Sequence, residues 1–330
     1  MMKKVVNRDV KTDVIRGLAI LLMFFAHSAP YVEDDSLTSN TIFRIICSLS
    51  APIFLFLVGY NLKKGHNSTI LKKGLFILLY AALIDLFVWD ILPFYSFDVL
   101  YLIGFSLILS PLWFKLNSYL LVGLIVFLFT TTFLYQLTDL YEFSLKEPSI
   151  SQFKQFSATI LFKNLFFDGW FPLFPWFSIV IFGYLVKNEI IQIKKILSIG
   201  IISFVMGLFL LYSNKPSYLR DFAIELFYPF SFGYLLIAFG WIVVVFNMPL
   251  NYNLKILSPL SKLGKVSLFI YAFHLAIYHV FFVKLQNQTA NFFISNLVFL
   301  IVYLFVAYFL EYIKNRYKIN NLFFNYIFGK

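Results

Sequence analysis

The first long apolar run of the chain reads DVIRGLAILLMFFAH over residues 13–27. Ionisable side chains are unfavourable in hydrocarbon, so Arg16 and His27 within this run indicate a functional helix. Eleven residues of α-helix rise about 16 Å and make about three turns, so both side chains project from one face. Asp13 precedes Arg16 by three residues and shares that face. One stripe therefore carries a carboxylate and a guanidinium near one end of the helix and an imidazole near the other.

The same stripe allows a purely structural interpretation. In that interpretation Asp13 and Arg16 form an ion pair, and His27 is a hydrogen-bonded histidine of the core. The choice between them depends on the rest of the chain.

The composition is that of a membrane protein. Of the 330 residues, 61% are hydrophobic, 21% are aromatic and only 13% are charged, and the mean hydropathy is +0.82. A soluble domain of this length could not bury so much apolar surface. The net charge of +11 does not indicate nucleic-acid binding, because the Lys and Arg residues lie in short loops between apolar runs. The single cysteine, Cys47, excludes an internal disulfide, and the four histidines lack the spacing of metal ligands, so no metal site is predicted.

About ten apolar stretches are long enough to cross a bilayer as helices. They fall near residues 13–32, 41–62, 72–92, 97–115, 118–138, 172–187, 194–213, 225–247, 264–284 and 290–313. Most of the 27 Lys and Arg residues lie in loops on the side of the N-terminus, and the positive-inside rule makes that side cytoplasmic. We therefore predict an all-α polytopic membrane protein with about ten transmembrane helices and with both ends in the cytoplasm. Such a protein is a multi-pass protein of the cell membrane and contacts membrane lipids.

The remaining segments predict a single domain over residues 1–330, because no internal repeat or low-complexity linker divides the chain. The longest connection, 139–171, is predicted to be an outer loop with a short amphipathic helix on the membrane surface. The tail 317–330 is rich in aromatic residues, which favours an interfacial helix over a further span. The sequence leaves the oligomeric state open, a homodimer included.

The predicted topology brings several charged residues to the same depth as His27, in the outer half of the membrane. Arg44 begins the second span, Asp85 lies in the outer half of the third, Asp98 opens the fourth and Asp168 precedes the sixth. A polar pocket that opens outward would explain these residues together, because isolated charges at that depth are unfavourable. For Asp98 and Asp168 the alternative is simple solvation at the interface.

The ninth span carries a second polar stripe. Ser267, Tyr271, His274 and Tyr278 follow one another at intervals of four, three and four residues, so they share one face of a helix. That face is predicted to look toward the interior of the bundle. His274 is then either a partner of the reacting groups or a packing histidine with a satisfied hydrogen bond.

The loops of the predicted inner side are basic, and they contain Lys72, Lys73 and Lys265. Topology alone explains such residues. A bound polyphosphate would also require them, because several cationic donors neutralise phosphate efficiently. The chain contains neither a Walker A nor a GxGxxG loop, so a nucleotide would not be held in either of those ways.

Five segments carry a resemblance to known families. The first span resembles the Arg-x10-His signature of the membrane acyltransferase-3 family, and the wider sequence resembles the related heparan-α-glucosaminide N-acetyltransferase catalytic-domain family. The matching segments occur in the family's order: DVIRGLAI at 13–20, APIFLFLVG at 51–59, FDVLYLIG at 97–104, FPLFPW at 171–176 and LGKVSLFIYAFH at 263–274. The resemblance implies a ten-helix acyltransferase, in which an acyl group passes from cytosolic acyl-CoA to an acceptor outside.

The resemblance also implies roles for residues. His27 matches the catalytic histidine of the motif, and a neutral histidine suits deprotonation of an amine or hydroxyl of a sugar, a glycan or another small acceptor. Arg16 matches the motif arginine, which either contacts the phosphates of acetyl-CoA or another acyl-CoA, or locks Asp13. Around them the expected CoA-binding residues are Arg16, Lys72, Lys73 and Lys265. The expected substrate contacts or supporting residues are Asp13, Arg44, Asp85, Asp98, Asp168, Trp176, Tyr271 and His274. N-acylation and O-acylation both remain open, as does an acyl-histidine intermediate.

A transporter or flippase is the alternative from another class, because it would also have about ten spans and buried charges. Transporters often contain inverted repeats and helices broken at the midplane. Pro52 and Pro175 lie within predicted spans, but no paired half of the sequence accompanies them. A membrane scaffold would leave the stripe with His27 unexplained.

Overall fold

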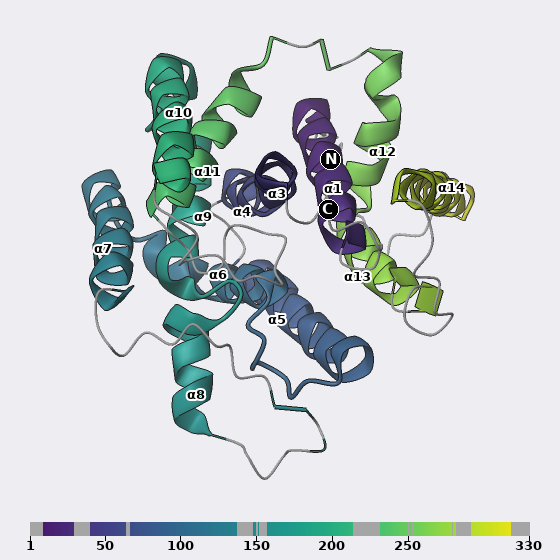
Figure 1. The fold of residues 1–330 in the computed structure, drawn as a ribbon, viewed down its shortest axis with the longest axis horizontal. Helices are drawn as coiled ribbons and strands as arrows, with labels where there is room; N and C mark the ends of the chain where they lie inside the picture. The colour runs from purple at the N-terminus through teal and green to yellow at the C-terminus, as the bar shows by residue number, and fades with distance from the viewer. Residues whose placement is uncertain are drawn as a thin grey trace, which may run out of the picture. The chain divides into compact units, whose positions relative to one another are not determined.

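The computed structural model describes residues 9–29, 40–63, 67–136, 148, 149, 151, 157–213, 232–249, 251, 252, 254–278, 280, 281 and 292–317. Within these ranges the regular structure is helical, apart from one isolated β-bridge between Ile91 and Ser149 (Figure 1). The chain divides into two compact units. The first combines Met1–Ile53 with Met248–Lys330, and the second is Phe54–Asn247. The single domain over residues 1–330 stays a prediction.

In the first unit, helix α1 (Val10–Ser28) packs against the other helices. Asp9 caps its N-terminus, where the carboxylate accepts a hydrogen bond from the backbone N–H of Lys11 at 3.0 Å and complements the helix dipole. The partners of α1 are α3 (Thr41–Ser48), α12 (Ser258–Lys265), α13 (Ser267–Tyr278) and α14 (Phe292–Arg316). A short 3-10 turn, η7 (Lys255–Leu257), leads into α12.

Helices α1 and α12 approach each other closely. A methyl group added to Gly17 would lie 2.0 Å from the carbonyl oxygen of Leu260. One added to Gly264 would lie 1.9 Å from the carbonyl oxygen of Asp13. The two backbones therefore touch, as small residues allow in membrane helices. Only glycine fits at these two positions without a shift of the backbone.

The ninth predicted span, 264–284, is not a single straight helix. Helix α12 ends at Lys265, Val266 has non-helical angles of φ −112° and ψ 24°, and α13 continues at an angle of 72°. The helical segment therefore begins before the predicted span, and the bend at Val266 lies near the start of the span.

The second unit contains the remainder of α4 (Ser50–Asn61), which starts in the first unit. Its helices are α5 (Asn67–Ile84), α6 (Val99–Trp113), α7 (Ser118–Gln136), α8 (Ala158–Lys163), α9 (Leu173–Lys187), α10 (Leu197–Ser213) and α11 (Phe232–Asn247). Two π-helical turns, η2 (Asp85–Trp89) and η4 (Asn164–Asp168), extend α5 and α8, and a 3-10 turn, η5 (Ile193–Ile196), precedes α10. The main packed pairs are α5 with α6, α7 with α9, and α10 with α11.

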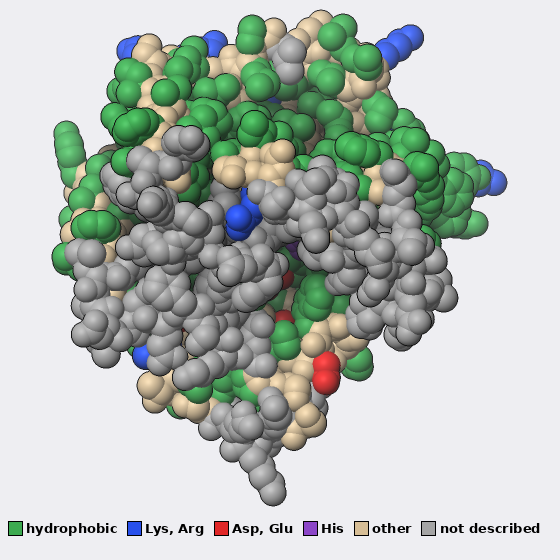
Figure 2. Space-filling model, in the orientation of Figure 1, with side chains coloured by type: hydrophobic (Ala, Val, Ile, Leu, Met, Phe, Trp, Pro, Cys, Tyr) green, Lys and Arg blue, Asp and Glu red, His purple; other side chains and the backbone are tan. Residues whose placement is uncertain are grey.

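The described helices are those of an integral membrane protein. Four are long and apolar enough to cross a bilayer: Thr41–Asn61, Ser118–Tyr135, Ile193–Leu211 and Phe292–Lys314. The number rises to six if each bent pair forms one span, namely Ala158–Asp168 with Leu173–Lys187 and Lys255–Lys265 with Ser267–Tyr278. Large apolar side chains are exposed along α7, α10 and α14. In Figure 2 hydrophobic side chains are prominent in the upper part of the face, among the atoms that are not grey. Lipid would cover such a surface.

Each of the predicted apolar stretches overlaps at least one of these helices. The total of about ten spans and the cytoplasmic location of both ends stay predictions. In the expected outer loop, the described part of 139–171 includes the bridge residue Ser149, and it also contains α8 and η4, which lead toward α9. Residues 318–330 of the predicted interfacial tail lie outside the described residues.

Candidate functional site

A pair of histidines joins α1 to α13. His27 lies in the last turn of α1, and its Nδ1 atom is 3.1 Å from Nε2 of His274. The other ring nitrogen of His274, Nδ1, is 3.1 Å from the backbone carbonyl oxygen of Ile270, one turn earlier on α13. His274 is completely buried and His27 is half-buried. The two rings thus form a hydrogen-bonded chain that ends on the backbone of α13.

Aromatic side chains surround this pair. The rings of Phe24, Tyr271 and Tyr278 lie 5.9, 5.6 and 5.6 Å from the ring of His274, measured between centroids. The hydroxyl of Tyr278 on α13 donates to the carbonyl oxygen of Phe24 at 3.3 Å, which fixes this part of α13 to α1. Tyr271, His274 and Tyr278 are all buried, so the predicted face of the ninth span does look inward. In such apolar surroundings a hydrogen bond between the rings is stronger than in water.

A second buried polar contact lies beside the pair. The amide of Asn296 on α14 donates to the hydroxyl oxygen of Ser28 at 2.8 Å. Ser28 directly follows His27, so this contact holds the end of α1 against α14. Sequence reasoning missed both residues, although an asparagine in a long apolar run is a signal of the same kind as a charge.

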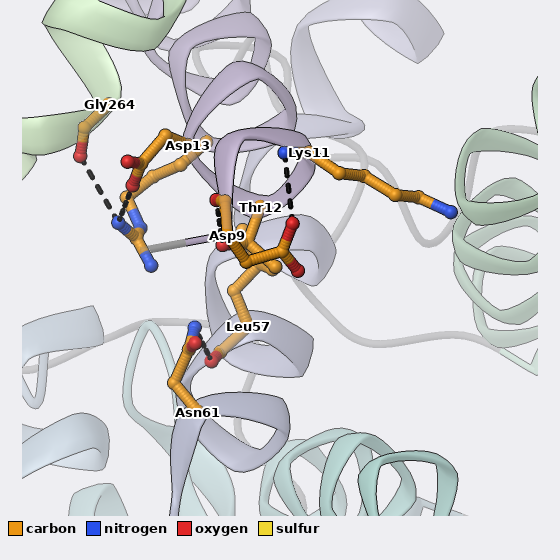
Figure 3. A network of polar contacts seen from close by, with 8 residues as sticks. Asp9, Lys11, Thr12, Asp13, Leu57, Asn61 and Gly264 are labelled. Carbon is orange, nitrogen blue, oxygen red and sulfur yellow. Dashed lines mark hydrogen bonds and ion pairs between the residues drawn. The ribbon is translucent and has the colours of Figure 1, made fainter. Parts of the chain in front are cut away.

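The other end of the α1 stripe contacts α12 (Figure 3). Arg16 Nη1 lies 3.1 Å from Asp13 Oδ1, which is the ion pair of the structural interpretation, and it also donates to the carbonyl oxygen of Gly264 at 3.2 Å. That carbonyl belongs to the last turn of α12, where carbonyl groups lack partners within the helix. Arg16 therefore supports the bend between α12 and α13. Helix α1 thus holds the bent segment at two places, through Arg16 at the bend and through His27 about three turns further on.

The predicted phosphate-binding cation Lys265 has an acidic neighbour. Its Nζ atom lies 3.2 Å from Oε1 of Glu311 on α14, and Lys262 pairs with the same carboxylate. All three side chains are partly exposed. Sequence reasoning missed Glu311, although a carboxylate within the last apolar stretch was a visible signal.

Arg44 also belongs to the first unit. It is half-buried on α3, one of the helices that pack against α1. Its carbonyl oxygen accepts a hydrogen bond from the hydroxyl of Ser48 at 2.7 Å. Arg44 therefore lies on a helix next to the one that carries His27, and its depth in the membrane stays a prediction.

In the second unit, Asp85 anchors the connection between α5 and α6. Its buried carboxylate accepts hydrogen bonds from the hydroxyl of Tyr101 at 2.6 Å and from the hydroxyl of Ser96 at 2.9 Å. The oxygen of Tyr101 also accepts from the backbone N–H of Phe94 at 3.0 Å. Sequence reasoning singled out Asp85 but missed both hydroxyl donors.

The connection that Asp85 anchors has strained backbone. Asp90, Phe94 and Phe97 have φ values of 55°, 72° and 43°, in the left-handed region that residues with a Cβ atom rarely adopt. Such strain persists only where surrounding contacts over-determine the conformation, and it is common near functional sites. The next residue, Asp98, caps α6 by accepting from the N–H of Val99 at 2.6 Å.

The remaining predicted residues of the second unit differ in their surroundings. Asp168 ends η4, is buried, and accepts from the hydroxyl of Tyr135 at 3.2 Å, so simple solvation at an interface does not describe it. Trp176 on α9 is completely buried, with its ring 4.9 Å from that of Phe171. Near the start of α5, Lys72 is exposed and Lys73 is half-buried.

The predicted residues are divided between the two compact units. The first unit holds Asp13, Arg16, His27, Arg44, Lys265, Tyr271 and His274. The second unit holds Lys72, Lys73, Asp85, Asp98, Asp168 and Trp176. The expected pocket that joins His27 to the carboxylates stays a prediction.

Comparison with known proteins identifies the family of the chain. The family model described as heparan-alpha-glucosaminide N-acetyltransferase, catalytic, matches residues 8–201. No curated protein matches the chain. The family match covers more than half of the chain and includes the whole of α1, with Arg16 and His27. The chain therefore belongs to the heparan-α-glucosaminide N-acetyltransferase catalytic-domain family.

Proposed function

We propose that this protein is an integral membrane acyltransferase. It moves an acetyl group from cytosolic acetyl-CoA, or another acyl group from its CoA ester, to an acceptor on the outer side. The acceptor is an amine or hydroxyl of a saccharide or another small molecule. The observation that carries the proposal is the hydrogen-bonded pair of His27 and His274 on buried helix faces, in a chain whose family is named for N-acetyl transfer.

The chemistry requires a base next to the acceptor. His27 accepts the proton of the amine or hydroxyl while the nitrogen or oxygen attacks the thioester carbonyl. A carbon–nitrogen or carbon–oxygen bond forms, the carbon–sulfur bond breaks, and the departing thiolate takes the proton back from His27. The transfer as written requires neither an oxidant nor a metal ion.

The donor requires cations for the phosphates of CoA. We assign this role to Arg16, Lys72, Lys73 and Lys265, on the predicted inner side. The guanidinium has several N–H donors, so Arg16 can support Gly264 through Nη1 and contact a phosphate through others. Glu311 neutralises part of the charge of Lys265, so Lys72 and Lys73 should contribute more to phosphate binding.

Acetyl-CoA should stabilise the purified protein and serve as donor. At about 100 times its Kd, a ligand of the native state adds about 2.7 kcal/mol to the free energy of unfolding. The thermal shift should be weaker in the double variant Lys72→Glu and Lys73→Glu. The matched control is Lys194→Glu with Lys195→Glu, two exposed lysines on η5 that no proposed site uses.

The measurement is the melting temperature in detergent with and without acetyl-CoA, together with transfer of a radiolabelled acetyl group to a panel of amino sugars and glycans. Stabilisation with transfer supports the proposal. Absence of both stabilisation and transfer would favour the transporter or flippase.

The proposed sidedness has a separate test. After Cys47 is replaced by serine, single cysteines are placed at Asp35, Ile150 and Asn287, all predicted to be outside. In intact cells an impermeant thiol reagent should label these three variants, whereas Gln192→Cys, predicted to be inside, should react only after permeabilisation. If Asp35→Cys and Ile150→Cys stay unlabelled while Gln192→Cys reacts, the proposed orientation is wrong.

A further inference from the structure

We infer that His274 is a positioning residue that fixes the tautomer of His27 and stabilises its protonated form. The inference rests on the proposed function, because it assigns a role in the acyl transfer for which His27 is the base. The family match ends at residue 201, so it does not reach His274. The geometry of the first unit alone carries the assignment.

The tautomers follow from which atoms can donate. The carbonyl oxygen of Ile270 can only accept, so His274 Nδ1, which is 3.1 Å away, must carry a proton. In a neutral imidazole the other nitrogen then has the lone pair, so His274 Nε2 is an acceptor. His27 Nδ1 is 3.1 Å from that acceptor and must carry a proton in turn. His27 Nε2 is therefore the basic nitrogen of its ring, and it enters every hydrogen bond as an acceptor.

The same chain of hydrogen bonds matters when His27 takes a proton. Protonation at Nε2 leaves the bond from His27 Nδ1 to His274 in place and makes it charge-assisted, which roughly doubles its strength. The fixed partner thus stabilises the imidazolium that forms as the acceptor loses its proton.

The surroundings hold His274 in this orientation. Its Nδ1 atom is bound to its own helix, and its ring packs against Phe24, Tyr271 and Tyr278. Rotation of the ring would break the hydrogen bonds of both of its nitrogens, to the carbonyl oxygen of Ile270 and to His27 Nδ1, in a buried place, which is unfavourable. A histidine that only filled space would not need both nitrogens aligned.

Three substitutions separate positioning from packing. His274→Phe keeps an aromatic ring but removes both nitrogens. His274→Asn can donate to Ile270 but is too short to reach His27. His274→Gln can place an amide oxygen near the position of Nε2, where it accepts from His27 Nδ1. We expect kcat to fall by about 10²-fold in the Phe and Asn variants, as for a misplaced catalytic group. We expect the Gln variant to recover most of the turnover.

The binding of acetyl-CoA and the folded state should change little in all three variants, so KM for acetyl-CoA and its thermal shift are the matched controls. A double-mutant cycle provides the decisive measurement. The loss caused by His274→Phe should nearly disappear in a His27→Ala background, because a positioning residue acts only through the group it positions.

The outcomes distinguish a failure of the proposed function from a failure of the inference alone. Lack of transfer by the wild-type protein would overturn the proposed function and the inference with it. With an active wild type, unchanged kcat in the Phe variant would overturn the inference alone. The inference would also be overturned if His274→Phe lowered kcat equally in the wild-type and His27→Ala backgrounds. A His274→Asn variant more active than His274→Gln would overturn it as well, because packing would then explain the result.

Discussion

Replacing His27 by alanine should abolish acyl transfer while the protein stays folded and still binds acetyl-CoA. A general base contributes typically about 10²–10⁴-fold in rate, so the loss should be of that size. The side chain is half-buried at the end of α1, so its removal leaves most of the packing of that helix intact. The measurement is transfer from a radiolabelled acetyl donor to a true acceptor, with the thermal shift by acetyl-CoA as the check on folding and donor binding.

The variant His27→Gln separates the base from the packing histidine. Glutamine keeps a hydrogen-bond donor toward His274 but cannot take a proton from the acceptor. We therefore expect it to be nearly as inactive as the alanine variant. A packing histidine predicts the reverse, namely an unstable alanine variant and an active glutamine variant. Near-wild-type turnover of His27→Gln would remove His27 from the mechanism and leave His274 as the next candidate.

Helical periodicity predicted the faces of the site but not all of its partners. Asp13 and Arg16 pair because three residues of helix bring their side chains together, which any helix dictates. The same rule placed Tyr271, His274 and Tyr278 on one buried face. The contact between His27 and His274 spans 247 residues of sequence, and only the packing of α1 against α13 creates it. The two interpretations of His274 therefore had to stay open at the level of sequence.

The bends and strained segments were less predictable still. Val266 lies at a bend of 72° although neither it nor a neighbour is proline, because tertiary contacts at Gly264 and Arg16 decide the path. In the same way, Phe94 and Phe97 adopt positive φ angles that local preference disfavours. The hydroxyl of Tyr101, bonded to Asp85, holds the first of them in place. Such positions are where local sequence rules fail, as is common near functional sites.

The close contact between α1 and α12 should be the most sensitive point for stability. In Gly17→Ala the new methyl group would lie 2.0 Å from a backbone oxygen, so the two helices must move apart. Overpacking of this kind lowers the free energy of unfolding by about 1–3 kcal/mol, and occasionally by more. The matched control is Gly123→Ala on α7, where a methyl group meets nothing within 4 Å. Because alanine favours helix over glycine by up to about 1 kcal/mol, the control should be unchanged or slightly more stable.

Gly264→Ala tests the same contact from the other helix. Each substitution alone separates α1 from α12. The second substitution should therefore lower the free energy of unfolding less once the first has moved the helices apart, so the two effects should not be additive. The separation would also lengthen the bond from Arg16 to the carbonyl of Gly264 and disturb the approach of His27 to His274. Acyl transfer should therefore fall in Gly17→Ala even at temperatures where the variant is fully folded. Thermal unfolding in detergent and the transfer assay measure both effects. If Gly17→Ala were as stable and as active as Gly123→Ala, the close approach of the two helices would be contradicted.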